Sequence, residues 1–435
     1  MKIRPESREL SHRAPWRAMA LLVAANSVLL VCPRALNATE VRIDGLWDAS
    51  VIVAGPAEIP FRFEISTNNG RVQGFFFEGD KKVGSTSGTF TNNQLVLQYE
   101  FIYTTLTATF DGKEFQGFYR QNRKNGKVYP FHARRFRPAD PESSAPPNVA
   151  GNWEMGLVVD DQHPAKDPYD LLSWKLYLRQ SGSEVSGSIL RLDGDTGTLT
   201  GRWQGNKLII SHFAGERPAL LEATLKPDGT LDAIYNRHSR YIAARVSEAR
   251  AKGIPEPPDP SRYSSVKDPT EPFRFQFPDL NGKTVSNTDE QFRGKVVLIT
   301  IGGAWCPNCR DEAPFLVDLY KRYHSQGLEI VSLNFEAAGD QDKPRVEYFV
   351  NEFKIPYTVL LAGAIGEVPE KLPQLVRFAG YPTAVFLGRD GRVRAVHAGF
   401  ASSATGEAST ELANETRSTI ERLLAEKPAA ASATR

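Results

Sequence analysis

Two cysteines separated by two residues are the feature of this 435-residue sequence that is best suited to chemistry. They lie in the order Trp305-Cys306-Pro307-Asn308-Cys309. A pair at this spacing, one helical turn apart, can be oxidised to a disulfide and reduced again, which is thiol-disulfide exchange. The alternative of a structural zinc site needs four ligands, and the sequence has neither a second such pair nor a histidine pair nearby. We therefore expect no metal and no cofactor.

The segments around the pair predict a strand followed by a helix. Residues 295–301 (KVVLITI) are apolar and β-branched, which favours a buried parallel strand. Residues 314–326 have apolar side chains at helical spacing, and Gly327 is a typical helix stop. The pair thus lies at a helix N-terminus, where unpaired N–H groups and the helix dipole favour the thiolate of Cys306. We expect Cys306 to be the more acidic and more exposed nucleophile, and Cys309 to be the resolving thiol.

The rest of the C-terminal region alternates between strand and helix patterns, which predicts an α/β domain at 271–427 followed by a disordered tail at 428–435. The expected elements are an edge strand at 273–277, a turn at 279–282, a buried strand at 328–335, a helix at 344–353, a short apolar run at 358–361, a helical turn at 371–377, a hairpin of strands 383–387 and 393–397, and a helix at 411–425.

Residues 41–246 contain two related units in tandem. Gly45-Leu46-Trp47 matches Gly151-Asn152-Trp153, and 88–97 (GTFTNNQLVL) matches 201–210 (GRWQGNKLII). Short alternating runs separated by Asn-Gly, Asp-Gly and Gly-Ser turns indicate antiparallel strands. The sequence predicts two small barrels or sandwiches, or one larger sheet built from both units, and does not choose between these.

We place the β-repeats at 39–140 and 141–250, and a stiff proline-rich linker at 251–270. The repeats act either as a binding module for an envelope partner or as a spacer or oligomerisation platform. Their scattered histidines, and one on a later strand, are expected to be surface or satisfied residues rather than ligands. These are His132, His163, His212, His238 and His397.

Residues 1–38 resemble a targeting leader. Basic residues precede an apolar run at 18–32, which is followed by a candidate cleavage site at Leu36-Asn37-Ala38. The run is shorter than the roughly 20 residues that span a bilayer, so we expect an exported, periplasmic chain with a cleaved leader. A retained membrane anchor and a lipid on Cys32 are the alternatives.

The charge balance excludes a nucleic-acid partner. The sequence has 53 Lys+Arg and 51 Asp+Glu, a formal net charge of +2, and no long basic stripe. An exported chain has access to structural disulfides, yet beyond the leader only Cys306 and Cys309 are present. The cysteines are therefore expected to be reactive rather than structural.

The element order, the cysteine motif and the later Tyr381-Pro382-Thr383 resemble the exported TlpA/ResA-like thiol-disulfide oxidoreductases of the thioredoxin superfamily. The resemblance covers about 273–424. Pro314 matches the proline that kinks the active-site helix, and Pro382 matches the cis-proline that faces the dithiol. The resemblance implies that the substrates are protein disulfides and that a membrane-bound donor supplies the electrons.

The resemblance also implies roles for side chains around the cysteines. Glu312, three residues after Cys309, matches an acidic residue that resembles a proton acceptor in ResA-like relatives. The alternative interpretation is that Glu312 is only a solvated carboxylate in the first turn of the helix. Trp305 either shields the dithiol and offers a docking surface or only packs. We expect substrate contacts from Trp305, Pro307, Tyr381 and Pro382.

The direction of electron flow is expected to be reductive. Oxidising members of the superfamily resemble one another in having a histidine just before the second cysteine, and this chain has Asn308 there. The hypothesis is an exported reductase of envelope protein disulfides. One alternative is a scaffold protein that acts through its β-repeats. The other is a peroxiredoxin-like peroxidase, which requires a loop with Pro and Thr around the reactive cysteine, and residues 300–304 do not provide this loop.

Overall fold

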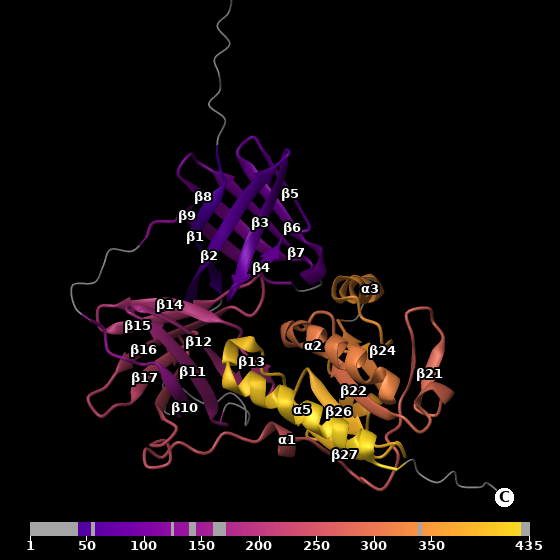
Figure 1. Ribbon diagram of the computed structural model, residues 1–435. Coiled ribbons are helices and arrows are strands. Elements are labelled where there is room, and N and C mark those ends of the chain that lie inside the picture. The colour runs from indigo at the N-terminus through magenta and orange to yellow at the C-terminus, as the bar shows by residue number, and fades with distance from the viewer. Residues whose placement is uncertain are drawn as a thin grey trace, which may run out of the picture. The chain divides into compact units, whose positions relative to one another are not determined.

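The computed structural model contains two nine-stranded antiparallel sheets and one five-stranded mixed sheet (Figure 1). The structure describes residues 42–53, 57–122, 126–138, 145–159, 171–337 and 342–427. The expected leader at 1–38, Cys32, His163 and the tail at 428–435 lie outside these ranges. Within them, no helix has the length and apolar character required to cross a lipid bilayer.

The first repeat is one sheet with its strands in the order β4-β3-β2-β1-β9-β8-β7-β6-β5. The inward side chains form an apolar core rich in aromatic rings, with Trp47, Phe63 and Phe76 fully buried. The alternation that predicted strands is visible as alternating burial along β7. The strands are β1 (Gly45–Val53), β2 (Ala57–Asn68), β3 (Arg71–Glu78), β4 (Lys81–Gly84), β5 (Ser87–Thr91), β6 (Gln94–Tyr99), β7 (Thr104–Phe110), β8 (Glu114–Gln121) and β9 (Val128–Arg135), with the 3-10 helix η1 (Glu100–Ile102) after β6.

The second repeat is a separate sheet in the order β11-β10-β18-β17-β16-β15-β14-β12-β13, and pairing between β11 and β12 closes it into a barrel. The sequence left open one sheet or two, and the structure has one for each repeat, so the predicted tandem all-β architecture is confirmed. The strands are β10 (Gly151–Leu157), β11 (Trp174–Ser181), β12 (Glu184–Arg191), β13 (Gly194–Asp195), β14 (Leu199–Gln204), β15 (Lys207–His212), β16 (Ala219–Leu225), β17 (Leu231–Tyr235) and β18 (Ser239–Arg245).

A tryptophan-arginine clasp joins the first and last strands of each repeat. The indole N–H donates to the carbonyl oxygen four residues earlier, at 3.0 Å for Trp47 and 2.9 Å for Trp153. The guanidinium of Arg135 lies 4.2 Å from the centre of the Trp47 ring, and that of Arg245 lies 4.0 Å from the centre of the Trp153 ring. The weak sequence repeat is therefore a structural repeat.

The C-terminal region is built on a five-stranded sheet in the order β24-β23-β22-β26-β27. Its central strand β22 (Val296–Gly302) runs parallel to β23 (Leu328–Glu336) and antiparallel to β26 (Thr383–Leu387). Every residue of β22 is buried, as expected for a continuous apolar run. The outer strands are β24 (Thr358–Ala364) and β27 (Val393–Ala398).

Apolar cores cover both faces of this sheet. One core includes side chains of α2 (Pro307–Tyr323), α3 (Asp342–Phe353) and α5 (Glu407–Ala425). The other includes side chains from the segment 273–292 and from α4 (Val368–Lys371). A sheet covered on both sides is the α/β architecture that the alternating pattern predicted, so the fold class is confirmed.

The helical turn expected at 371–377 is wrong. The helix lies earlier, as α4, and β25 (Leu375–Val376) is a strand paired with β19 (Ser265–Val266). Pro373 explains the difference, because a proline disfavours helical backbone at the residue that precedes it.

The edge strand expected at 273–277 begins late. The strand observed is β20 (Gln276–Pro278), which pairs with β21 (Thr284–Ser286). Phe273 and Phe275 are buried in the core instead of extending the ladder. The turn at 279–282 is present, since the N–H of residue 282 donates to the carbonyl of residue 279 at 3.0 Å.

The predicted linker makes contacts at both ends. Ile254 packs with Ala244 and Ala249 of the second repeat. After the short helix α1 (Pro260–Tyr263), the hydroxyl of Ser264 donates to the carbonyl of Arg377 at 2.8 Å. The segment is therefore held by both bodies that it joins.

Trp47→Phe and Trp153→Phe should each lower the free energy of unfolding by about 1–3 kcal/mol, because each change leaves a buried carbonyl without its donor and removes ring volume. Denaturant unfolding followed by far-UV circular dichroism measures the loss. Leu46→Ala is the control, since Leu46 is 37% exposed, and it should change the value by less than about 0.5 kcal/mol. A clear loss in one repeat with none in the other would contradict the equivalence of the two clasps.

Candidate active site

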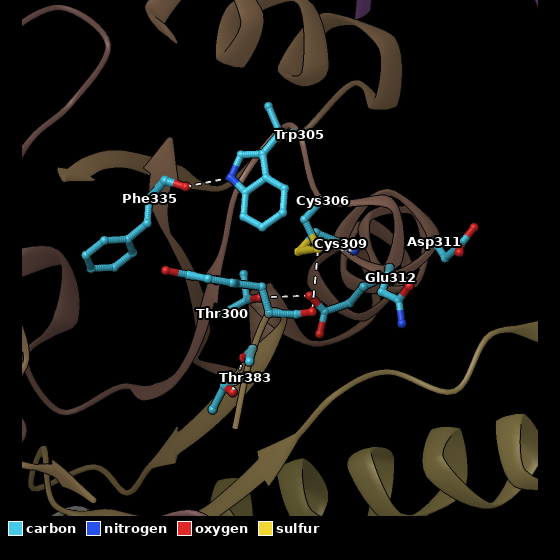
Figure 2. Close-up of a disulfide and its surroundings, with 12 residues drawn as sticks. Thr300, Trp305, Cys306, Cys309, Asp311, Glu312, Phe335 and Thr383 are labelled. Atoms are coloured by element: carbon cyan, nitrogen blue, oxygen red, sulfur yellow. Dashed lines mark hydrogen bonds between the residues drawn. A yellow bond between two sulfur atoms is a disulfide. The ribbon is translucent and has the colours of Figure 1, made fainter. Parts of the chain in front are cut away.

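The turn from β22 into α2 carries the cysteine pair (Figure 2). Cys306 is the N-cap residue of α2, with φ −83° and ψ 117°. Its sulfur accepts a hydrogen bond from the backbone N–H of Cys309 at 3.2 Å. Pro307 occupies the start of the helix, where a missing N–H loses no helical bond. The pair therefore lies where the sequence placed it, at the beginning of a helix.

The two cysteines form a disulfide, with 5.2 Å between their Cα atoms. Cys306 is 3% exposed and Cys309 is 6% exposed. The expectation that Cys306 is the more exposed residue is therefore wrong for this oxidised form, and the reason is that other parts of the chain cover it. The relative acidity of the two thiols stays a prediction, because a disulfide does not titrate.

The loop that contains Pro382 faces the disulfide. The Tyr381–Pro382 peptide bond is cis, as predicted. The carbonyl oxygen of Tyr381 lies 3.5 Å from the sulfur of Cys306. The rings of Trp305 and Tyr381 meet edge to face, with their centroids 5.4 Å apart. The structure thus brings Trp305 and Tyr381 together beside Cys306, with Pro382 next to Tyr381 in the chain. Pro307 follows Cys306 at the start of α2, and the substrate-binding roles of all four residues stay predictions.

The end of β23 holds the loop before Cys306. The indole N–H of Trp305 donates to the carbonyl of Phe335 at 2.8 Å, as Figure 2 shows. The backbone N–H of Ala304 donates to the carboxylate of Glu336 at 2.6 Å. Glu336 is buried, and the guanidinium of the buried Arg345 lies 4.0 Å from its other oxygen. Sequence reasoning missed Glu336, because it lies 32 positions from its partner at the end of an apolar strand.

Glu312 lies on the sheet side of α2, next to Cys309. Its carboxylate accepts a hydrogen bond from the hydroxyl of Thr300 at 2.7 Å (Figure 2). Glu312 is 5% exposed, and burial raises its pKa to about 7. Together with Cys309 it lines a cavity of about 10 Å³, which is the size that admits one water molecule. Glu312 is therefore not a solvated first-turn carboxylate.

Arg217 of the second repeat reaches the outer side of α2. Its guanidinium donates to the side-chain oxygen of Asn308 and to Asp311, the latter at 3.2 Å. It also donates to the backbone carbonyl of Asp195 at 3.1 Å and lies 3.9 Å from Glu78 of the first repeat. Burial raises the pKa of Asp311 to about 6 and also raises that of Glu78, although Arg217 opposes both shifts. Sequence reasoning found none of these contacts.

The three repeat histidines that the structure describes have polar partners within their own or the neighbouring repeat. His212 is buried against Glu78, with 3.3 Å between its Nε2 and the carboxylate, and burial lowers its pKa to about 3. His132 contacts Glu114 at 2.8 Å, and His238 contacts a neighbouring serine hydroxyl. In the ranges that the structure describes, no group of three or more His, Cys, Asp or Glu side chains could hold a metal ion.

Comparison with known proteins finds relatives of the C-terminal region. Residues 266–412 match the Redoxin family. The chain is 29% identical over 122 residues to the thiol-disulfide oxidoreductase ResA of Bacillus thuringiensis subsp. konkukian, a match that covers 27% of this chain and 62% of that protein. It is 27% identical over 129 residues to ResA of Bacillus subtilis, covering 30% and 66%. The matches thus span just under two thirds of these relatives, and the predicted resemblance of the C-terminal region is confirmed.

Solved structures of similar proteins match about a third of the chain. A putative thiol:disulfide interchange protein DsbE from Chlorobium tepidum has 22% identity and a TM-score of 0.29, covering 36% of this chain and 99% of that one. A DsbF homologue from Corynebacterium diphtheriae has 21% identity and a TM-score of 0.30, covering 37% and 94%.

The stability of the oxidised protein should depend on the protonation of Glu312. Its folded pKa of about 7 lies above the ordinary value of 4.5, so between these pH values the folded protein binds a proton that the unfolded chain has lost. The contribution of Glu312 is therefore fully present below pH 4.5 and is lost as the pH rises to about 7. Relative to Glu312→Gln, the free energy of unfolding should fall by about 3 kcal/mol over this interval.

Urea unfolding of both proteins without reductant, at a series of pH values, measures this difference. Other carboxyl groups with raised pKa values, such as Glu78 and Asp311, also make stability depend on pH. Both proteins share these groups, so subtracting one free energy of unfolding from the other removes their contribution. A difference that stays constant with pH would show that the folded protein does not hold a proton on Glu312 in this range.

Proposed function

We propose that this chain is a thiol-disulfide oxidoreductase that reduces protein disulfides through Cys306 and Cys309. The observation that carries the proposal is the capped helix terminus, where the sulfur of Cys306 accepts the N–H of Cys309. A hydrogen bond to sulfur at this position favours the thiolate, which is the attacking species in thiol-disulfide exchange. The resemblance to ResA supports the same reaction class.

The proposed reaction takes two exchange steps. In the first, the Cys306 thiolate attacks one sulfur of the substrate disulfide, a mixed disulfide forms, and the other substrate sulfur leaves as a thiolate that takes up a proton. In the second, the Cys309 thiolate attacks the Cys306 sulfur and releases the second substrate thiolate. The substrate gains two electrons, and the cysteine pair becomes the disulfide that the structure contains.

The second step requires Cys309 to lose its proton, and Glu312 is suited to accept it. The two side chains line the same small cavity, and the carboxylate has a pKa of about 7 because it is buried. A base with a pKa close to the working pH can take a proton and return it. Water in the cavity would connect the two groups.

The charges near the pair favour a reductant. Asn308 provides no imidazolium, and Glu312 adds no positive charge: it is neutral while protonated, and once ionised it disfavours a second negative charge on sulfur. Arg217 brings a cation to Asn308 that the sequence did not reveal. That cation is surrounded by Asp311, Glu78 and Asp195, which offset its charge.

The proposed setting is the bacterial envelope. The leader-like residues 1–38 support export, which would give Cys306 and Cys309 access to envelope proteins. A reductase outside the cytosol must be recharged, and we propose a membrane-bound electron donor, with the β-repeats available for an envelope partner.

Insulin reduction driven by dithiothreitol tests the activity. The purified chain should accelerate precipitation of the insulin B chain, and Cys306→Ser should reduce the rate to that of dithiothreitol alone, because the attacking sulfur is lost. Leu46→Ala is the control, because Leu46 lies partly exposed in the first repeat, and it should leave the rate unchanged. Precipitation catalysed equally by Cys306→Ser would refute the proposed role of Cys306.

Equilibration of the oxidised and reduced protein with glutathione buffers tests the direction. We expect a reduction potential below about −200 mV, in the range of reducing members of the superfamily. A value near about −120 mV, typical of a strong oxidant, would contradict the reductase proposal. A mixed disulfide trapped on a Cys309→Ala variant would identify the substrate by mass spectrometry.

A further inference from the structure

A turn of the second repeat, 192–195, lies against the side of α2 that carries Cys306. Its backbone is so close to Asn308 that a Cβ atom at Gly194 would collide with the Asn308 amide nitrogen. A Cβ atom at Gly399 would lie only 2.6 Å from both the nitrogen of Gly194 and the carbonyl oxygen of Leu192. The backbone N–H of Gly399 in turn donates to the carbonyl of Pro382 at 2.8 Å. The turn therefore reaches from Asn308, two residues after Cys306, to Gly399, which is hydrogen-bonded to Pro382.

Polar contacts hold the turn in this position. Asp195 is fully buried and accepts the backbone N–H of Ser402, just after the last strand of the redox domain. Arg217 bonds Asn308 and Asp311 on α2 and the backbone of Asp195 in its own repeat. Because Arg217 bonds both to α2 and to the backbone of Asp195, it links the turn to the helix.

An apolar contact lies beside these polar groups. Tyr177 and Leu190 of the second repeat pack against the cluster of Ala401, Ala408 and Leu412. These side chains belong to the same contact between the second repeat and the redox domain. The contact thus combines a small apolar patch with a charged cluster.

The covering contact obstructs the chemistry that the cysteines would perform. An attacking thiolate must align with both sulfurs of the substrate disulfide, which requires open space in front of Cys306. Cys306 is 3% exposed and Asn308 is 7% exposed. The turn lies against Asn308, Gly380 and Gly399, which flank Cys306 and Pro382, so it occupies space that a disulfide on a folded protein would need.

We propose that the second repeat determines which substrates reach the dithiol, with the turn 192–195 as a gate over Cys306 and Arg217 as the residue that holds the gate closed. The proposal rests on the proposed function, because a gate matters only if Cys306 reacts. Substrates are admitted in proportion to the fraction of molecules in which the turn has moved away. The repeat is then a selectivity element of the enzyme rather than only a spacer.

The rate of alkylation of Cys306 tests the gate without relying on turnover. We would use the full chain with Cys309→Ala, so that no disulfide can re-form, and follow iodoacetamide labelling of the peptide that carries Cys306 as a function of pH. Arg217→Gln and Asp311→Asn are added separately, because they remove the same contact from its two sides. At high pH every molecule carries the thiolate, so the plateau rate reports access, whereas the midpoint reports the thiol pKa.

Both variants should raise the plateau rate about tenfold, because each removes a charge-assisted contact that favours the closed state. Arg240→Gln is the matched control. Arg240 donates to Asp232 at 2.9 Å within the same repeat, and its loss should leave the plateau unchanged. Far-UV circular dichroism and melting temperature confirm that each variant is folded. Plateau rates within about twofold of the parent for both folded variants would overturn the gate.

Insulin reduction by the same variants, with Cys309 restored, separates the two proposals. An increase in parallel with the plateau rate supports both. A raised plateau with no insulin reduction in any variant keeps the gate and refutes the oxidoreductase function. Insulin reduction with an unchanged plateau keeps the function and refutes the gate.

Discussion

The hydrogen bond from the Cys309 N–H to the sulfur of Cys306 is the interaction on which the redox domain depends. It makes a sulfur atom the cap of α2, so the unpaired N–H groups of the helix terminus would also stabilise negative charge on a reduced Cys306, the proposed nucleophile. Other parts of the domain position the turn that carries Cys306. The buried strand β22 fixes where the turn begins, and Glu336 fixes its last residues through the N–H of Ala304.

Acidic groups lie on both sides of the helix, and their surroundings give them different behaviour. Glu312 faces the sheet and has a neutral partner in Thr300, so burial dominates and the carboxyl group holds its proton near neutral pH. Asp311 faces the second repeat, where Arg217 partly compensates for burial. The inner acid can therefore exchange a proton near neutral pH, whereas the outer acid takes part in a contact between domains.

The sequence predicted what depends on neighbouring residues and missed what depends on distant ones. The apolar run at 295–301 and the alternating runs of the repeats specify their strands locally, and Tyr381-Pro382 was recognised from its motif. The contact between Arg217 and Asn308 could not be read in the same way, because the two residues lie 91 positions apart in the sequence. The choice between a barrel and a sandwich was left open for the second repeat, since closure depends on the pairing of β11 with β12 rather than on either strand alone.

A comparison of the two repeats shows how one loop position acquired two kinds of contact. Ten residues separate Leu97 from Ala108, and twelve separate their counterparts Ile210 and Ala223, so the second loop is longer. In the first repeat this loop stacks Phe101 on Tyr348 of α3, with ring centroids 6.0 Å apart, and places Tyr103 under Arg345 at 4.2 Å. In the second repeat it carries Arg217 to the acids around α2. Because the desolvation of buried ions offsets much of their attraction, the charged contact contributes less net stability than its short distances suggest. The aromatic loop is therefore suited to remain docked, whereas the charged loop makes the attachment that is easier to break, as the proposed release of the turn 192–195 requires.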